Sequence, residues 1–415
     1  MTTSKSVAKG AALVLAALAL SMPCSPCAAQ AGQEHPIGES VRKDALHAIH
    51  RGVQWLERSQ QETGCWSDAS FPAVTALAVS AILRSPAATG GAHEESVRRG
   101  LDFILSCVQD DGGIYQQVEG AKGGGLPNYN TAICLMALLD GADPKYDAVI
   151  ARARAFLINA QHQGEGVFRG GMGYDRGTDR PYADLSNTIF ALEAVRGTDA
   201  IEGAREGANR LDWEAAIAFV SRCQHLRETN DADWVSDDPG ERGGFVYHPL
   251  KSHAGGAESS DEGEYLRSYG SMTYVGLLSL LYADVGRDDP RVLAAVDWIT
   301  RHWTLDENPG MGAQGLYYGY HTMAKSLGAF GQETLRLPGD KNVAWRQALV
   351  EKLVTLQRID PETGLGYWQN DNNRWWENDA NLVTSYTLLA LEIALACPSS
   401  AISAHTGISQ GEPPG

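Results

Sequence analysis

The amino-acid sequence predicts an all-α fold, an α/α toroid in which six helix pairs form an α6/α6 barrel. Two observations predict it. Six times, an amphipathic helical segment is followed by a turn of glycine and aromatic residues and then by a more apolar helical segment with a threonine near its start. The second segments are apolar or small nearly all round, so they must be buried on several sides. A closed ring with these segments inside buries all of them.

The turns set the order of the helix pairs along the chain. They begin at Gly64, Gly112, Gly171, Gly243, Gly315 and Gly364, and the threonines that follow are Thr75, Thr131, Thr188, Thr273, Thr322 and Thr384. The threonines are too irregularly spaced for a rigid solenoid, but each interval suits one helix pair with loops of varying length.

The two members of each pair differ in the faces that they bury. In the first segment, Val53 and Leu56 stand among Arg51, Glu57 and Arg58, which is the spacing of a surface helix. The second segments, such as residues 75–83, 131–139, 273–281 and 384–395, have no such polar face. The last of them runs apolar to its end, without the polar cap that an open solenoid needs, so the sequence favours closure.

The predicted toroid spans residues 43–396. Residues 1–31 have the layout of a cleaved signal peptide, with Lys5 and Lys9, an apolar run too short to span a bilayer, and small residues ending at Ala31. Pro23 directly before Cys24 disfavours a lipid anchor. We therefore expect export to the periplasm or the extracellular space, no transmembrane segment, and a disordered tail at residues 397–415.

The net charge limits the classes of partner that we expect, and the cysteine content indicates whether disulfides hold the fold. The chain has 34 Lys and Arg against 51 Asp and Glu, a formal net charge of −17, so nucleic acid is not an expected partner, and protein partners stay open. The cysteines after residue 31 are too few and scattered for a disulfide scaffold and are expected to be buried thiols. They are Cys65, Cys107, Cys134, Cys223 and Cys397.

A long insertion at residues 226–267 precedes the inner segment at residues 273–281. It is rich in acids and includes His248 and His253. A solvated acidic loop is the expected reading. A calcium site and a lid over the cavity mouth are the alternatives, although the acids lack the fixed spacing of a calcium loop.

The first repeat, from Arg51 to Trp66, resembles the Gln-Trp repeat of squalene and oxidosqualene cyclases and of protein prenyltransferase β subunits. Glutamine recurs at comparable positions in Gln109, Gln161, Gln224 and Gln357, so the resemblance covers most of the chain. It implies a terpenoid cyclase-like toroid whose ligand lies in a central cavity near the N-termini of the inner helices. The glutamines are expected to satisfy backbone groups at helix ends and to tie outer helices together.

The resemblance therefore places the residues at the start of each inner helix, its entrance, around the ligand. Several entrance residues are polar or aromatic, and capping of the helix is the alternative role for the polar ones. The residues expected in the cavity are Asn130, Asn187, Tyr269, Ser271, Tyr318, Trp375, Trp376 and Asp379.

Two catalytic signatures of these relatives are incomplete here. The stretch Asp184 to Thr188 resembles the Asp-x-Asp-Asp-Thr motif of squalene-type cyclases, but Ser and Asn replace the second and third acids. Hydrogen bonds from its neighbours should hold Asp184 as an ordinary carboxylate. At the zinc position of prenyltransferases, only His321 remains, beside Tyr269 and Ser271. We expect neither a metal nor a cofactor.

These observations predict an exported toroid whose cavity binds an isoprenoid-like or other apolar ligand. If it is an enzyme, Asp184 and His321 are the expected acid–base pair. The alternative is a carbohydrate-active or glycan-binding toroid that uses Asp184, Glu377 and Asp379, since glycoside hydrolysis needs paired carboxylates. A scaffold with a filled cavity is the remaining class.

Overall fold

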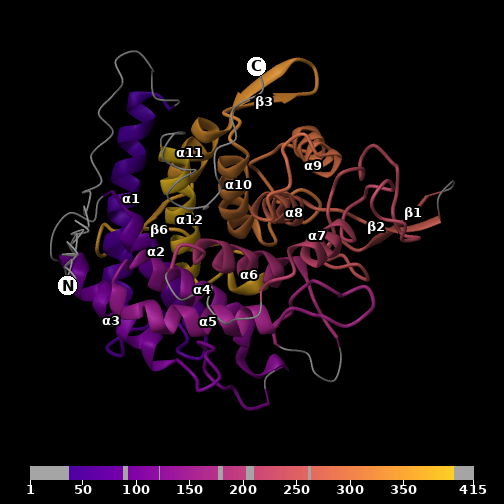
Figure 1. The fold of residues 1–415 in the computed structure, drawn as a ribbon. Helices are drawn as coiled ribbons and strands as arrows, with labels where there is room; N and C mark the ends of the chain where they lie inside the picture. Colours follow the sequence, from indigo (N-terminus) through magenta and orange to yellow (C-terminus); the bar gives the residue numbers. More distant parts are fainter. Residues whose placement is uncertain are drawn as a thin grey trace, which may run out of the picture. The chain divides into compact units, whose positions relative to one another are not determined.

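The computed structural model describes residues 37–86, 92–120, 122–175, 181–201, 210–259 and 263–396. The predicted signal peptide, the predicted tail and Cys397 lie outside these residues. Within them the chain forms twelve α-helices (Figure 1). They are α1 (Glu39–Ser59), α2 (Pro72–Arg84), α3 (Ala92–Ser106), α4 (Pro127–Asp140), α5 (Asp147–Asn159), α6 (Leu185–Gly197), α7 (Trp213–Ser221), α8 (Gly270–Tyr282), α9 (Pro290–Arg301), α10 (Leu316–Phe330), α11 (Trp345–Thr355) and α12 (Ala380–Leu395).

The even-numbered helices form a closed inner ring. Each of them packs against the next in chain order, and α12 packs against α2. The odd-numbered helices lie around this ring, with α3 against α2, α5 against α4, α9 against α8 and α11 against α12 (Figure 1). The contact between α12 and α2 joins the two ends of the array. The predicted α/α toroid is thereby confirmed.

Burial follows the predicted difference between outer and inner helices. Every residue of α8 is buried. In α1 the buried side chains include Ala45, Ile49, Val53 and Leu56, a spacing of three or four that marks a single face. The inner helices thus bring apolar surface from all sides to the centre, and the outer helices cover them.

The repeat threonines fasten the turns to the inner helices. In five repeats the threonine hydroxyl accepts a hydrogen bond of 2.8–3.1 Å from a turn backbone N–H; the donors are Trp66, Ile114, Met172, Phe245 and Trp368. In the fifth repeat, Thr322 instead donates to the carbonyls of Tyr318 and Gly319. The predicted turn at Gly315 differs because Gly315 is the N-cap of α10, so the residues after it are already helical.

Three of the repeat glutamines, Gln161, Gln224 and Gln357, tie their turns to the next outer helix, as expected. Gln161 Nε2 donates to the carbonyls of Gly170 and Asp212, and its Oε1 accepts from Asp212 N–H at the start of α7. Gln357 Nε2 donates to Ala48 O in α1, which links the last outer helix to the first. Gln109 differs, because among the described residues its side-chain amide bonds only within its own turn, to Cys107 O and Tyr115 O.

Short helices and strands lie in the connections, which were predicted to be loops. The 3₁₀ helices are η1 (Lys122–Gly125), η2 (Pro144–Tyr146) and η3 (Arg374–Trp376). Three antiparallel hairpins pair β1 (Gly256–Ser259) with β2 (Gly263–Leu266), β3 (Thr334–Leu337) with β4 (Lys341–Ala344), and β5 (Arg358–Ile359) with β6 (Gly366–Tyr367). Their registers place Gly256 opposite Leu266, Thr334 opposite Ala344 and Arg358 opposite Tyr367.

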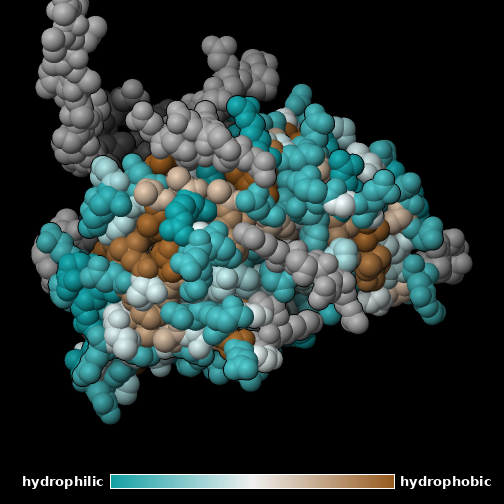
Figure 2. All heavy atoms as spheres, turned by 60° about the horizontal axis from the view of Figure 1, so that its bottom comes forward, coloured by the Kyte–Doolittle hydropathy of each residue, from teal (hydrophilic) through white to brown (hydrophobic). Residues whose placement is uncertain are grey.

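The surface is mixed in character. On the face in Figure 2, hydrophobic patches lie among hydrophilic side chains. Across the described residues, no helix has both the length and the apolar character needed to cross a membrane. The four cysteines that the structure describes are buried and free, as predicted; they are Cys65, Cys107, Cys134 and Cys223.

Candidate functional site

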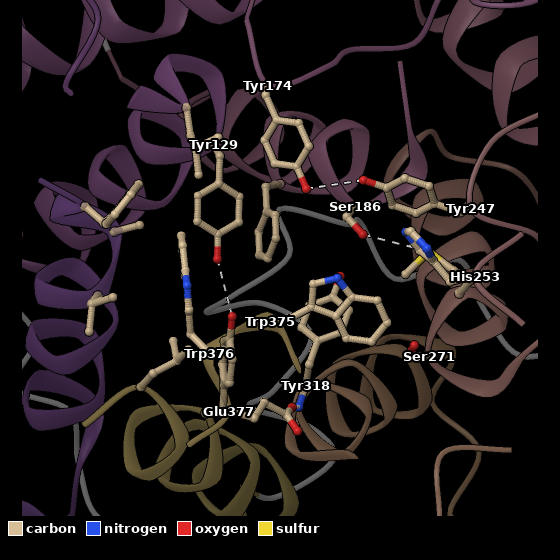
Figure 3. Close-up of a pocket in the computed structure, with 18 of the residues that line it drawn as sticks. Tyr129, Tyr174, Ser186, Tyr247, His253, Ser271, Tyr318, Trp375, Trp376 and Glu377 are labelled. Atoms are coloured by element: carbon tan, nitrogen blue, oxygen red, sulfur yellow. Dashed lines mark hydrogen bonds between the residues drawn. The ribbon is translucent and has the colours of Figure 1, made fainter. Parts of the chain in front are cut away.

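A cavity of about 320 Å³ lies where the inner helices begin. All six of these helices contribute a side chain to its wall, and the remaining wall comes from loops and η3 (Figure 3). The wall consists of Phe71, Ala73, Val74, Leu126, Tyr129, Tyr174, Ser186, Phe190, Tyr247, His253, Tyr269, Ser271, Met272, Tyr318, Trp375, Trp376, Glu377, Leu382 and Tyr386. Side chains therefore leave the centre of the ring unfilled at this end.

Four rings of the wall contact one another in a closed circuit, which we call the aromatic box: Tyr129, Phe190, Tyr318 and Tyr386. The Tyr129 and Phe190 rings meet edge to face with centroids 5.3 Å apart. The ring centroids lie 6.3 Å apart between Phe190 and Tyr318 and 5.9 Å apart between Tyr318 and Tyr386. The hydroxyls of Tyr386 and Tyr129 lie 3.4 Å apart and complete the circuit. Since the rings come from α4, α6, α10 and α12, the inner ring of helices fixes the box.

Trp375 and Trp376 form the edge of the cavity in η3 (Figure 3). Their side chains are 41% and 49% exposed, and both have a positive φ, which is rare for bulky residues. Contacts on both sides hold this backbone. The ring centroids of Trp375 and His253 lie 5.3 Å apart, and those of Trp376 and Phe71 lie 4.7 Å apart. A second groove, of about 210 Å³, lies beside Trp376 and includes Asp379.

Glu377 is a buried carboxyl on the cavity wall, 1% exposed, beside Tyr318 (Figure 3). Its Oε1 accepts the backbone N–H of Tyr318 at 2.7 Å, and its Oε2 accepts from Asn370 Nδ2 at 2.6 Å. It therefore caps α10, whose own N-cap residue, Gly315, has no side chain to do so. Burial nevertheless outweighs these donors and raises the pKa of Glu377 to about 7.

Asp184 lies behind the cavity wall, fully buried at the N-cap of α6. Its carboxylate accepts the backbone N–H of Asn187 at 2.9 Å and the Asn187 side chain at 2.8 Å. The predicted hydrogen bond from Asn187 is therefore present. The prediction that Asp184 has an ordinary pKa is wrong, because burial raises the pKa of Asp184 to about 6. The Tyr247 hydroxyl, which also interacts with Asp184, lies 3.2 Å from that of Tyr174, so a chain of polar groups joins Asp184 to the cavity.

His321 also lies outside the cavity wall. Its ring stacks on the ring of Tyr386 with centroids 5.3 Å apart, and Tyr386, not His321, lines the cavity. Its Nδ1 is buried and has no hydrogen-bond partner among the described residues, and burial lowers the pKa of His321 well below its usual value. Within the described residues no hydrogen bond or ion pair joins Asp184 to His321. The structure thus does not bring the expected acid–base pair together on the wall.

The other predicted cavity residues divide into two groups. Tyr269, Ser271, Tyr318, Trp375 and Trp376 line the cavity. Asn130, Asn187 and Asp379 do not, because their side chains bond the backbone or a neighbour.

The contacts of this second group are those of caps and tethers. Asn130 accepts the backbone N–H of Ala73 at 3.0 Å and donates to Gly125 O at 2.7 Å. Asn187 bonds Asp184. Asp379 caps α12 by accepting the N–H groups of Asn381 and Leu382.

The insertion at residues 226–267 contributes to the cavity through its middle. Tyr247 and His253 line the wall, and their rings lie 4.3 Å apart. The acids Asp231, Asp233, Asp237 and Asp238 are exposed. Asp261 and Glu262 lie outside the described residues. Within the described residues, no group of three His, Cys, Asp or Glu side chains could hold a metal ion.

Sequence reasoning missed three members of the aromatic box: Tyr129, Phe190 and Tyr386. A signal for two of them was present, since Phe190 and Tyr386 each stand two residues after a repeat threonine. Both are therefore at the same point of an inner helix and face the same end of the ring.

No protein-family model matches the chain. Its structure is similar to that of protein geranylgeranyltransferase-I from Candida albicans in complex with GGPP, with a TM-score of 0.54 at 13% identity, over 83% of this chain and 90% of that one. It is also similar to a type II terpene cyclase from Scytonema, with a TM-score of 0.48 at 12% identity, over 86% of this chain and 98% of that one. A novel alpha-amylase from Clostridium perfringens matches with a TM-score of 0.48 at 10% identity, over 85% and 97%. The chain thus has an α/α toroid fold similar to that of the protein prenyltransferase.

Proposed function

We propose that this protein is exported and binds an isoprenoid-like, largely apolar molecule in its central cavity. The observation that carries the proposal is the composition of the wall, where aromatic and aliphatic side chains surround only a few polar groups. Ligand sites of this kind bind through apolar burial, and their sparse polar groups orient the ligand. The export part rests on residues 1–31 alone.

An isoprenoid without a diphosphate suits the wall better than an isoprenoid diphosphate. The similar Candida albicans structure holds GGPP, which supports an isoprenoid chain in a toroid of this type. A diphosphate, however, needs cationic or N–H partners, and none of the described residues that line this cavity is a lysine or arginine. We therefore propose an isoprenoid-like ligand that carries no diphosphate group.

Binding is the activity that the geometry supports, with no reaction step assigned. Asp184 and His321 stand behind the wall, so neither touches a ligand in the cavity as it stands. The glycan alternative needs two carboxyls facing the ligand. Of its three expected acids, Glu377 lines the cavity, whereas Asp184 is behind the wall and Asp379 faces the second groove. The wall therefore favours an apolar ligand over glycoside hydrolysis.

Isothermal titration calorimetry with geraniol tests this proposal, with geranyl diphosphate and maltotriose as comparison ligands. The variant Ser186→Trp places a large side chain into the cavity from α6, and Ser106→Trp, at an exposed position of α3, is its matched control. We expect geraniol to bind one site per chain, more tightly than either comparison ligand. Ser186→Trp should weaken binding at least about tenfold, a cost of about 1.4 kcal/mol, and Ser106→Trp should not.

Two results would overturn the proposal. One is the absence of geraniol binding by the wild-type protein. The other is binding that Ser186→Trp leaves unchanged, because the ligand would then lie outside the cavity. Tighter binding of maltotriose than of geraniol would favour the glycan alternative.

A further inference from the structure

We infer that the ligand of this cavity carries a quaternary ammonium group, and that the aromatic box together with Glu377 holds that group. This inference rests on the proposed function, since it names the ligand chemistry of the same cavity. It adds a charge to a ligand that is otherwise apolar, and it assigns that charge a place in the structure.

The aromatic box brings four rings of the cavity wall into contact with one another. A cation within about 6 Å of an aromatic centroid is attracted to the face of the ring, and quaternary ammonium groups are recognised by several rings together. Here four rings from four different helices contact one another in a circuit, at centroid distances of 5.3–6.3 Å for the three ring pairs that meet. A group in the cavity beside the box therefore lies against several aromatic rings at once.

The charge on the wall has the matching sign. Glu377 is a carboxyl on the cavity wall, and no lysine or arginine is among the described residues that line it. Burial lowers the pKa of His253 to about 4, so this imidazole is uncharged near neutral pH and does not repel a cation. Because the surroundings of Glu377 are buried, its charge is little screened by solvent.

The same segment already uses an aromatic face to hold a cation. The guanidinium carbon of Arg374 lies 4.6 Å from the ring centroid of Trp375, which is two residues before Glu377. A quaternary ammonium group has no N–H to satisfy, so it needs few hydrogen-bond acceptors and fits a wall that is mostly carbon. A metal ion would need several oxygen or nitrogen ligands, and the described residues offer no cluster of three.

Choline and 3,3-dimethylbutan-1-ol form the test pair. The two molecules have the same shape, but choline has a charged nitrogen where the alcohol has a quaternary carbon. Calorimetric titration of the wild-type protein at about pH 8 should give choline an affinity at least about tenfold higher than that of the alcohol, from the cation–π attraction and the nearby carboxylate.

Two variants test whether the preference for choline arises at the aromatic box and Glu377. Glu377→Gln removes the negative charge at nearly constant shape, and Phe190→Leu removes an aromatic face while it keeps an apolar side chain and loses no hydrogen bond. Each should reduce the ratio of the two affinities to within about threefold of one. Phe156→Leu, the same substitution in the core between α5 and its neighbours, is the matched control and should keep the wild-type ratio.

The outcomes separate this inference from the proposed function. Equal or weaker binding of choline, or no choline binding at all, overturns the inference, and so does a preference that both Glu377→Gln and Phe190→Leu leave intact. If geraniol still binds and still responds to Ser186→Trp in that case, the proposed function stands without the cation. If geraniol binding is absent as well, both are overturned.

Discussion

Glu377 and Asp184 show how burial changes the chemistry of a capping carboxyl. Both accept backbone N–H groups at the start of an inner helix, contacts that favour the charged form. Burial acts in the opposite direction and is the larger effect, so the pKa of Glu377 is raised to about 7 and that of Asp184 to about 6. Near neutral pH the two carboxyls can therefore change protonation state, whereas a solvated cap would stay ionised.

The pH dependence of stability should report the Glu377 shift. The pKa of Glu377 in the folded protein lies above its usual value of 4.5, so the folded state binds the proton more tightly than the unfolded state. Its contribution to the free energy of unfolding must then rise as the pH falls from about 8 to about 5. Asp184 adds a smaller contribution of the same sign at lower pH.

The comparison of wild type with Glu377→Gln isolates this group. Urea unfolding at several pH values between about 5 and 8 should show the wild type gaining about 2–3 kcal/mol more than the variant as the pH falls. Wild-type and variant stabilities that run parallel over this range would mean that Glu377 titrates like an exposed carboxyl.

The threonine contacts give a second test at this scale. Thr188→Val leaves the backbone N–H of Met172 buried without its acceptor, which should lower the free energy of unfolding by about 1–3 kcal/mol. Thr322→Val is the matched control, because Thr322 accepts no turn N–H and bonds only within α10. Chemical denaturation of both variants measures the difference. Equal losses would show that the turn contact contributes nothing specific.

What the sequence predicted for single residues depended on local contacts. The Asp184 to Asn187 hydrogen bond was predictable because the two residues are three apart. The raised pKa of Asp184 was not, since it depends on how deeply helices far apart in sequence bury the carboxyl. The same reason explains Asn130, whose partner Ala73 lies on another helix.

At the scale of helices and turns, the glutamine tethers distribute stability around the outer layer. Gln161 joins the turn after α5 to the first residues of α7 through three hydrogen bonds. The turn glycines allow the close approach: Gly243 has a φ of +90°, and a Cβ there would collide with Ala294 O in α9. The outer helices α7 and α9 are therefore positioned by the turns that precede them.

Hydrogen exchange should show this coupling between elements. Gln161→Ala should speed the exchange of backbone amides in α7 by about tenfold or more, because the tether to Asp212 at the helix start is lost. Gln109→Ala is the control, since the Gln109 side chain bonds only within its own turn. An α7 that exchanges no faster in Gln161→Ala than in Gln109→Ala would contradict the tether.

The helices could be predicted from the sequence because their apolar periodicity extends over many residues, and the three hairpins could not. Their strands are two to four residues long, too short for an alternating pattern to be recognised. The turn at Gly315 was predicted wrongly for a related reason. Its glycine and aromatic residues match the other turns in composition, and only the three-dimensional cap by Glu377 shows that α10 has already begun.

For the whole molecule, closure of the inner ring determines both stability and the cavity. The contact between α12 and α2 means that no inner helix is an end of the array. Closure was predictable because every inner segment is apolar nearly all round, including the last. The aromatic box was not, because it requires knowing which faces of four inner helices converge.

A closed ring should unfold as one unit. An open array can lose helix pairs from its ends, but removal of any pair from this ring exposes the apolar faces of two neighbours. We expect urea unfolding curves from far-ultraviolet circular dichroism and from tryptophan fluorescence to coincide, with a single midpoint. Separate midpoints for the two signals would mean that parts of the ring unfold independently.

The most direct test of the account is a crystal structure of the protein grown with a brominated apolar alcohol, such as 10-bromodecan-1-ol. The central claim is that an apolar ligand occupies the cavity at the start of the inner helices. We predict an anomalous bromine peak within that cavity, bounded by Tyr129, Phe190, Tyr318 and Tyr386. Bromine bound only elsewhere, or side chains that fill the cavity and leave no room for the ligand, would contradict the claim.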